Sequence, residues 1–224
     1  MEKGYAEEGC GARHGHSLRI APAILPRASS WDGVRGRADL VHAILGGNCC
    51  PLSLSVPELE IAIVRARREE LPEVQRLAGI VWRSHYPGII TDEQIDYMLE
   101  RGYTLDTLAG FLDAPDRGLE LARVDHGIAG FAAWYVTDRP AEAKLDKLYV
   151  LQSRQREGIG GRLIACVEGQ ARAVGALTLA LNVNRKNVQA VRAYEKHGFM
   201  VREAVVVDIG QGFVMDDYVM AKAI

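Results

Sequence analysis

The chain has 224 residues, of which 48% are hydrophobic and 25% are charged, and its formal net charge is −2 at pH 7. These are ordinary values for a globular protein, and the length allows one domain with a sizeable core and an extension. The slightly negative charge argues against a general nucleic-acid surface, and no apolar run reaches the roughly 18 to 20 residues of a membrane-spanning helix. We therefore expect neither nucleic acid nor a membrane among its partners.

Residues 1–59 are predicted to form a poorly ordered N-terminal extension. They contain scattered Gly, Pro, Ser and Arg without a sustained hydrophobic period, so nothing in them predicts a regular element. A partner-binding or regulatory arm and an early start of translation are the alternatives. The N-terminus opens with Glu2, Lys3, Glu7 and Glu8, which is unlike a secretory signal.

The four cysteines favour a reduced protein. Cys49 and Cys50 are adjacent, but no second pair stands at metal-ligand spacing, and Cys10 and Cys166 are isolated. A cytoplasmic protein that holds no metal is the simplest interpretation.

Regular secondary structure is predicted from residue 60 onward, where the hydrophobic pattern becomes periodic. Alternating apolar residues favour strands, and apolar residues three or four apart favour helices. Thr91-Asp-Glu-Gln94 is a capping-box signature, and Asp125-His-Gly127 predicts a hairpin turn. In chain order the pattern predicts a strand over 60–66, helices over 69–85 and 91–101, strands over 119–124, 128–136 and 144–150, a helix from 159, a strand over 177–183, a helix that holds residue 194, and two closing strands over 201–209 and 213–221.

The most informative segment is the glycine-rich turn from Gln155 to Gly161, between a predicted strand and a predicted helix. Such a turn binds anions, because its backbone N–H groups point outward and the helix dipole adds partial positive charge. A P-loop would need Lys-Ser or Lys-Thr after the last glycine, where Arg162 and Leu163 stand. A dinucleotide-binding turn would need a third glycine at Leu163 and an acid about 20 residues further on, and 178–182 contains none.

Two interpretations of the turn remain: a plain strand-to-helix connection, or the Gln/Arg-x-x-Gly-x-Gly/Ala turn that cradles the pyrophosphate of coenzyme A. Gln155, Gly158 and Gly160 match the second pattern at every position. Here the chain resembles the GNAT family of acyl-CoA-dependent N-acetyltransferases. The second motif of that family, Asn-x-x-Ala-x-x-x-Tyr-x-x-x-Gly-Phe, is matched in full by residues 187–199.

The resemblance covers about residues 60–224 and implies one N-acetyltransferase domain of the α/β (α+β) class. Its expected centre is a mixed, mostly antiparallel sheet flanked by helices. The sheet should be splayed between the strand before the glycine turn and the next strand.

The resemblance also implies which residues meet acetyl-CoA. In the family, the strand before the turn pairs with the pantetheine arm, one of its amides faces the acetyl carbonyl, and the turn holds the pyrophosphate. Tyr194 matches the tyrosine that protonates the leaving thiolate, although it could be a core aromatic. Asn187 could be only the N-cap of its helix, or could also touch the cofactor. The expected cofactor-binding residues are Leu148, Tyr149, Val150, Gln155, Arg156, Glu157, Gly158, Ile159, Gly160, Gly161 and Asn187.

The general base is harder to assign. Relatives that acetylate protein N-termini carry a glutamate on the strand before the Asn motif, and Asn182 stands at the matching position. An amide cannot accept a proton at neutral pH, so this departure puts that base and that substrate class in doubt.

We take Asp146, acting through water, as the catalytic base beside Tyr194 as the catalytic acid. Strict alternation would place the Asp146 side chain on the strand face of Leu148. The alternative is a carboxylate that is solvated or paired with Lys147. Further candidates without a stronger claim are Asp216 and Asp217.

The acceptor pocket is predicted from the two early helices and the closing hairpin. Aromatic and acidic side chains there could hold a small cation, although acids in a first helical turn often only favour the helix dipole. The residues concerned are Trp82, His85, Tyr86, Tyr97, Asp92, Glu93 and Asp96.

We therefore expect an acyltransferase that moves the acetyl group of acetyl-CoA directly to a primary amine, in a ternary complex. A small-molecule acceptor is favoured. The alternatives are a protein Lys or N-terminal acetyltransferase and a non-catalytic acyl-CoA-binding sensor, and a homodimer is left open.

Overall fold

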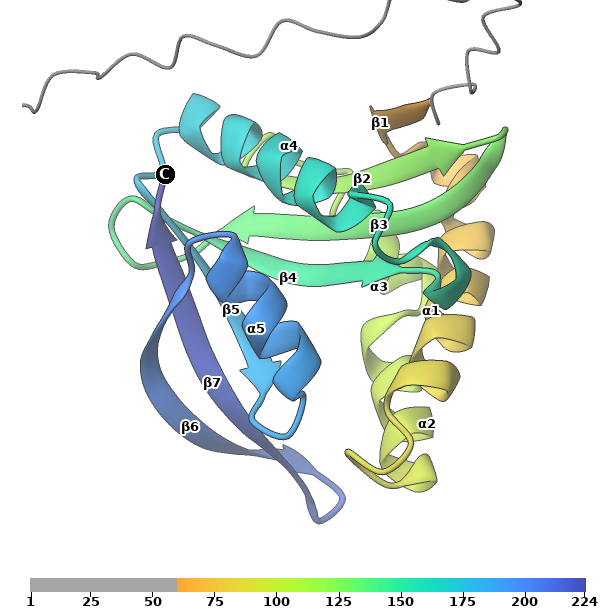
Figure 1. The fold of residues 1–224 in the computed structure, drawn as a ribbon, viewed down its shortest axis with the longest axis vertical. Coiled ribbons are helices and arrows are strands. Elements are labelled where there is room, and N and C mark those ends of the chain that lie inside the picture. The colour runs from red at the N-terminus through yellow and green to blue at the C-terminus, as the bar shows by residue number, and fades with distance from the viewer. Residues whose placement is uncertain (1–59) are drawn as a thin grey trace, which may run out of the picture. The chain divides into compact units, whose positions relative to one another are not determined.

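The computed structural model describes residues 60–224, and the predicted extension 1–59 lies outside the described residues. Within the described part, seven strands form one sheet in the order β1-β2-β3-β4-β5-β7-β6 (Figure 1). The elements in chain order are β1 (Ile61–Arg65), η1 (Arg68–Glu70), α1 (Leu71–His85), α2 (Asp92–Gly102), α3 (Leu105–Ala109), β2 (Arg117–Val124), β3 (Gly127–Val136), β4 (Glu142–Val150), η2 (Gln152–Arg154), α4 (Ile159–Ala173), β5 (Thr178–Asn184), α5 (Val188–Lys196), β6 (Met200–Gly210) and β7 (Phe213–Ala223).

The predicted order of elements is confirmed, with the short helix α3 as an addition. The turn between β2 and β3 has positive φ at Asp125 (49°) and His126 (69°), which is the backbone of a tight hairpin with the twist that strands prefer. Helix α1 ends at His85, before a turn in which Gly88 has a φ of 82°. None of the helices between residues 60 and 224 is both long enough and apolar enough to cross a membrane.

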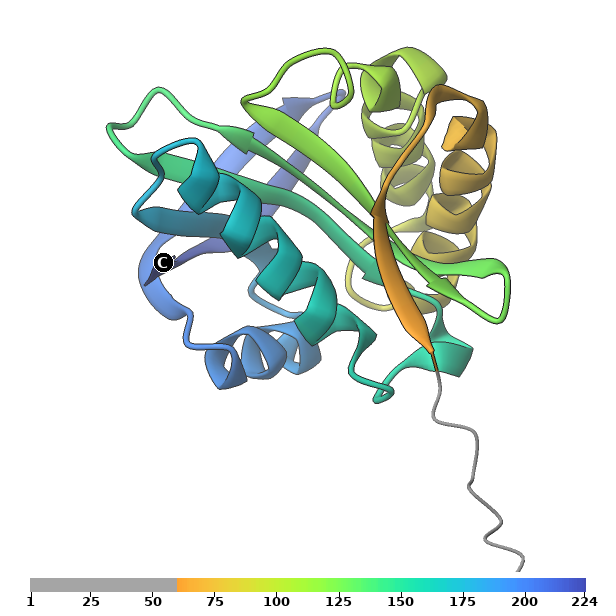
Figure 2. The same cartoon turned by 90° about the horizontal axis from the view of Figure 1, so that it is seen from above.

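Helices cover both faces of the sheet, so it has two cores. Helices α4 and α5 lie over one face, and α1, α2 and α3 lie over the other (Figures 1 and 2). Burial of a large apolar side chain stabilises the fold by about 1.5–3 kcal/mol each, so both layers are firmly held. The first core includes Leu145, Leu163, Val167, Leu181 and Phe199, and the second includes Leu77, Ile95, Leu108, Leu121 and Phe131.

The sheet opens between β4 and β5, as expected. These two strands are parallel, and they pair only from Glu142 to Leu145 against Thr178 to Leu181. Beyond that point β4 continues to Val150 and β5 to Asn184 without pairing to each other, and the two ribbons diverge in Figure 1. The end of β4 therefore has a free edge inside the sheet.

A β-bulge accompanies the opening. Ala133 pairs with Lys147 and Trp134 with Leu145, so Asp146 is the extra residue on β4. A bulge bends its strand and changes which face the following side chains reach. Both Leu145 and Leu148 pack on the first core, which strict alternation forbids. The expectation that Asp146 shares the face of Leu148 is therefore wrong, because the bulge shifts the alternation by one residue.

Helix α2 is attached to the closing hairpin. Thr91 caps it by accepting from the Gln94 backbone N–H at 3.2 Å. The Gln94 side chain reaches β7 instead of completing the capping box, and donates to the Val214 carbonyl oxygen at 2.9 Å. The Tyr97 hydroxyl donates to the carbonyl oxygen of Ile209 on β6. These contacts hold α2 beside the hairpin, next to the sheet opening.

Candidate active site

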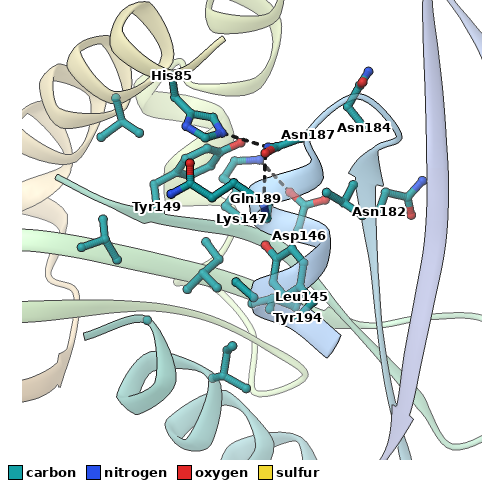
Figure 3. A pocket seen from close by; sticks show the side chains of 18 of the residues that line it. His85, Leu145, Asp146, Lys147, Tyr149, Asn182, Asn184, Asn187, Gln189 and Tyr194 are labelled. Carbon is teal, nitrogen blue, oxygen red and sulfur yellow. Dashed lines mark hydrogen bonds and ion pairs between the residues drawn. The ribbon is translucent and has the colours of Figure 1, made fainter. Parts of the chain in front are cut away.

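A cavity of about 590 Å³ occupies the opening between β4 and β5 and reaches both faces of the sheet (Figure 3). On the face of the first core its wall includes Gly158, Gly160, Gly161, Ile164, Ala190 and Tyr194. On the opposite face its wall includes Trp82, His85, Tyr86, Met98, Tyr103 and Asp217. One space therefore joins the glycine turn to the helices predicted to select the acceptor.

The glycine turn forms an anion cradle. Gly158 is the N-cap of α4 with a φ of 81°, a conformation that glycine adopts without strain. The first helical hydrogen bond runs from Arg162 N to the Gly158 carbonyl oxygen at 3.1 Å. The amides from Gly158 to Gly161 have no acceptor among the described residues, and a Cβ added at Gly158 or Gly160 would meet nothing within 4 Å. Free amides at an open helix N-terminus suit a phosphate group.

The free edge of β4 fits an extended ligand that carries amides. Unpaired backbone groups inside a sheet require partners, and an extended chain can supply them as an added strand does. Leu148 and Val150 line the cavity from this edge. The backbone therefore fits the pantetheine arm of coenzyme A, beside a turn that fits its pyrophosphate.

The predicted cofactor-binding residues lie together, with one exception. All of them line the cavity except Glu157, whose carboxylate lies 3.7 Å from the Arg154 guanidinium. The Tyr149 side chain belongs to the wall on the second face, where it packs near Trp82, Tyr103 and Phe131.

Tyr194 lies on α5 and presents its phenol to the cavity. Its ring packs edge-on against Phe199 with centroids 5.7 Å apart. Burial raises the pKa of its hydroxyl well above the ordinary value, and the nearby Tyr86 adds to this shift. No hydrogen bond from the described residues contributes to this shift, so a protonated donor lines the cavity.

Asn187 and His85 meet across the cavity, a contact that the sequence pattern does not predict. The Asn187 Oδ1 accepts from Ala190 N at 3.2 Å, which makes it the N-cap of α5. Its Nδ2 lies 2.9 Å from His85 Nε2 at the end of α1 (Figure 3). Because the amide nitrogen of Asn187 can only donate, His85 Nε2 is the acceptor of this hydrogen bond. The two residues are 102 positions apart in the chain, so only the folded structure brings them together.

Asp146 is engaged by a buried lysine. Lys147 Nζ donates to Asp146 Oδ2 at 2.6 Å, and Lys147 is only 8% exposed. The same ammonium lies 4.8 Å from the ring centroid of Tyr103 and 5.2 Å from that of Phe111, which places it on the second face. The Asp146 carboxylate therefore has a partner before any substrate enters.

Asp217 is a buried carboxylate with a free oxygen. It stands on β7 opposite Asn184 and is 6% exposed. No residue between 60 and 224 makes a hydrogen bond to its Oδ1. Burial raises the pKa of this carboxyl, and a hydrogen bond from Asn182 and the positive charge of Lys144 oppose that shift. The sequence alone could have indicated that Asp217 is buried, because it stands in an alternating series whose other members, Phe213, Met215 and Val219, are apolar.

The predicted acceptor residues divide into two groups. Trp82, His85 and Tyr86 line the cavity, and the rings of Trp82 and Tyr86 stack with centroids 4.3 Å apart. Tyr97 packs on the closing hairpin instead, and Asp96 is 2.5 Å from Arg83. Asp92 and Glu93 do not line the cavity. Of the predicted acceptor residues, Trp82, His85 and Tyr86 thus line the cavity, and the acids of its lining are Asp146 and Asp217.

Comparison with known proteins identifies relatives of the chain. The family model described as acetyltransferase (GNAT) family matches residues 76–199. An uncharacterised N-acetyltransferase of Mycobacterium tuberculosis is 30% identical over 155 residues, which is 68% of this chain and 98% of that protein. The spermidine N(1)-acetyltransferase of Thermoplasma acidophilum is 25% identical over 162 residues, which is 70% of this chain and 97% of that protein.

Solved structures show the same fold. The PaiA N-acetyltransferase from Thermoplasma acidophilum, in complex with coenzyme A, has a TM-score of 0.63 at 24% identity and covers 74% of this chain and 99% of its own. The ribosomal-protein-S18-alanine N-acetyltransferase from Escherichia coli has a TM-score of 0.56 at 20% identity and covers 74% of this chain and 94% of its own. With the match to the family model over most of the described chain, these findings establish that the protein belongs to the GNAT family of N-acetyltransferases.

Proposed function

We propose that the protein transfers the acetyl group of acetyl-CoA to the primary amine of a small molecule, directly and in a ternary complex. The observation that carries the proposal is the cavity itself. It joins a cradle of free amides to an aromatic wall with a buried carboxylate, so that both substrates can share one space.

Backbone groups are the proposed binding site for acetyl-CoA. The amides from Gly158 to Gly161 would hold the pyrophosphate, and the free edge of β4 from Leu148 to Val150 would pair with the pantetheine arm. Asn187 lines the same cavity. An amide of β4 would then stabilise the charge that develops on the carbonyl oxygen during attack.

Tyr194 is the proposed acid of the transfer. As the amine nitrogen bonds to the acetyl carbon, the carbon–sulfur bond breaks, and the Tyr194 hydroxyl gives its proton to the sulfur. The raised pKa keeps this phenol protonated at neutral pH, so it holds a proton for the sulfur as the carbon–sulfur bond breaks. A second proton on the nitrogen then restores the phenol. Direct transfer is favoured because Cys166 lies on α4 outside the cavity, and burial raises the pKa of its thiol.

A small amine is the proposed acceptor. The relative named spermidine N(1)-acetyltransferase supports this class, and Asn182 stands where relatives that modify protein N-termini carry a glutamate. An amine is mostly protonated at neutral pH, and only its neutral form attacks a thioester. The site must therefore remove a proton. Asp146 is the base that the sequence favours, and Asp217 is compared with it below.

The test is an acceptor screen that follows free thiol released from acetyl-CoA. We expect turnover with small cationic amines such as spermidine, and we expect Tyr194→Phe to lower kcat by about 10²-fold or more without changing acetyl-CoA affinity. Binding of acetyl-CoA without thiol release toward any amine would support the acyl-CoA sensor. Unchanged kcat in Tyr194→Phe would remove the proposed acid.

A further inference from the structure

We propose that Asp217, and not Asp146, is the carboxylate that binds the ammonium group of the acceptor and takes its proton. The inference rests on the proposed transfer to an amine and names the residue that receives that amine.

One carboxylate oxygen of Asp217, Oδ1, lacks a partner among the described residues. A buried polar group without a hydrogen bond is rare and unfavourable, and an unpaired buried carboxylate is more unfavourable still. Oδ1 of Asp217 is such a group among the described residues, and the residue that carries it lines the cavity. A primary ammonium supplies what this oxygen lacks: an N–H donor and a positive charge.

The competing acids already have cationic partners. Asp146 accepts from the buried Lys147 at 2.6 Å. Asp216 accepts from Arg185 at 3.1 Å, has a side chain that is 43% exposed and does not line the cavity. Asp217 is the member of this set that lines the cavity without an ion pair to any described residue.

The surroundings of Asp217 favour proton transfer. Lys144 on β4 contributes positive charge, Asp216 on its own strand contributes negative charge, and Asn182 on β5 donates a hydrogen bond. The phenol of Tyr86, at the end of α1, lies near Asp217. On β6, Val205 pairs with Asp217, and α2 contacts β7 through the neutral side chain of Gln94. Burial is the largest influence and raises the pKa of Asp217. A carboxylate that binds protons more readily is a better base near neutral pH.

The aromatic wall narrows the class of acceptor. Trp82 and Tyr86 stack on the same side of the sheet as Asp217, and aromatic faces attract organic cations. The Tyr103 and Tyr149 hydroxyls stay protonated, because burial raises their pKa values. The site therefore suits an alkyl or arylalkyl primary amine, whose ammonium meets Asp217 and whose carbon chain meets the rings.

The proposed reaction accounts for every proton. The bound R–NH3+ gives one proton to Asp217, which passes it to solvent. The neutral nitrogen then attacks the acetyl carbon. Its second proton goes to the Tyr194 oxygen, which has given its own proton to the sulfur. The products are the N-acetyl amine, the free thiol of coenzyme A and one released proton.

The experiment compares Asp217→Asn with Asp146→Asn and with the surface variant Asp138→Asn, because Asp138 is exposed and does not line the cavity. Spermidine and phenethylamine are the probes, thiol release is followed from pH 6 to 9, and acetyl-CoA affinity is measured by calorimetry. We expect Asp217→Asn to lower kcat/KM by about 10²-fold or more and to remove the limb in which kcat/KM rises as Asp217 ionises. Asp138→Asn should stay within about threefold, and Asp217→Glu should recover part of the rate.

The outcomes test the role of Asp217 and the proposed function separately. Unchanged acetyl-CoA affinity in Asp217→Asn shows that this variant is folded. The inference is supported when Asp217→Asn loses rate while Asp146→Asn keeps the rise of kcat/KM with pH that the wild type shows. An Asp217→Asn enzyme with nearly full rate and an intact pH limb overturns it. If the wild-type protein binds acetyl-CoA but acetylates neither probe, the proposed small-amine function fails first and the role of Asp217 falls with it.

Discussion

At the scale of single residues, Asp146 neutralises the ammonium of Lys147, which is buried on the face of the sheet that α1, α2 and α3 cover. Lys147 is buried, its Nζ is 2.6 Å from Asp146, and two aromatic rings surround it. Asp146→Asn would leave this ammonium without its counter-charge. Removing one partner of a buried pair is strongly unfavourable, whereas replacing both is often nearly neutral.

We therefore expect Asp146→Asn to lower the free energy of unfolding by about 1–3 kcal/mol, measured by urea denaturation. The matched control is the double variant Asp146→Asn with Lys147→Met, which should recover most of the loss because no charge is left buried. Equal stability of wild type and Asp146→Asn would contradict a structural role for the pair. The result also separates loss of fold from loss of chemistry when Asp146 is tested as a base.

Residue partners were the least predictable feature of the site. The assignment of Asp146 relied on strict alternation along β4, and a single bulged residue invalidated that argument. The contact between His85 and Asn187 joins elements that are far apart in sequence. Local patterns carry no information about such pairs. They could predict residue types at the site but not which acid would remain without a partner.

At the scale of elements, the connection from β4 to α4 was predictable because its requirements are local. Gly158 must adopt a positive φ, and the residues after it must leave the helix N-terminus open. These demands fall on a few consecutive residues, so the sequence displays them directly. The capping box at α2 shows the limit of the same logic. Thr91 caps the helix as predicted, but tertiary contacts draw the Gln94 side chain to β7.

The prediction at this scale is that Gly160→Glu abolishes tight binding of coenzyme A. A Cβ at Gly160 meets nothing within 4 Å, so the backbone should accept the side chain, while its carboxylate would occupy and repel the anion site. We expect calorimetry to show at least a tenfold weaker affinity, about 1.4 kcal/mol. Gly169→Glu is the matched control, because Gly169 lies exposed on the same helix with equally open surroundings. Equal losses in both variants would indicate damage to α4 rather than to the turn.

At the scale of the whole molecule, the sheet consists of two packed parts, β1 to β4 and β5 to β7, which separate beyond the short stretch where β4 pairs with β5. The order of strands and helices could be predicted from periodicity, apart from α3, whose five residues are too few to show a period. The splay was available only through family resemblance, because the apolar run of β5 predicts a buried parallel strand and not the point at which pairing stops. The continuity of the cavity through both faces follows from the bulge and the early end of β4–β5 pairing together.

A ligand that fills the opening should protect the backbone on its rim and little else. We expect acetyl-CoA to slow amide hydrogen exchange in peptides that cover 146–150 and 157–162, because these segments have the free edge and the free amides. Peptides from β1 and β2 should exchange at unchanged rates, since their ladder is complete without a ligand. Exchange followed by mass spectrometry, with and without acetyl-CoA at about 100 times its Kd, gives the comparison. A uniform slowing across all peptides would show only the global stabilisation that any ligand of the native state gives, about 2.7 kcal/mol at that concentration, and would contradict binding at these two segments in particular.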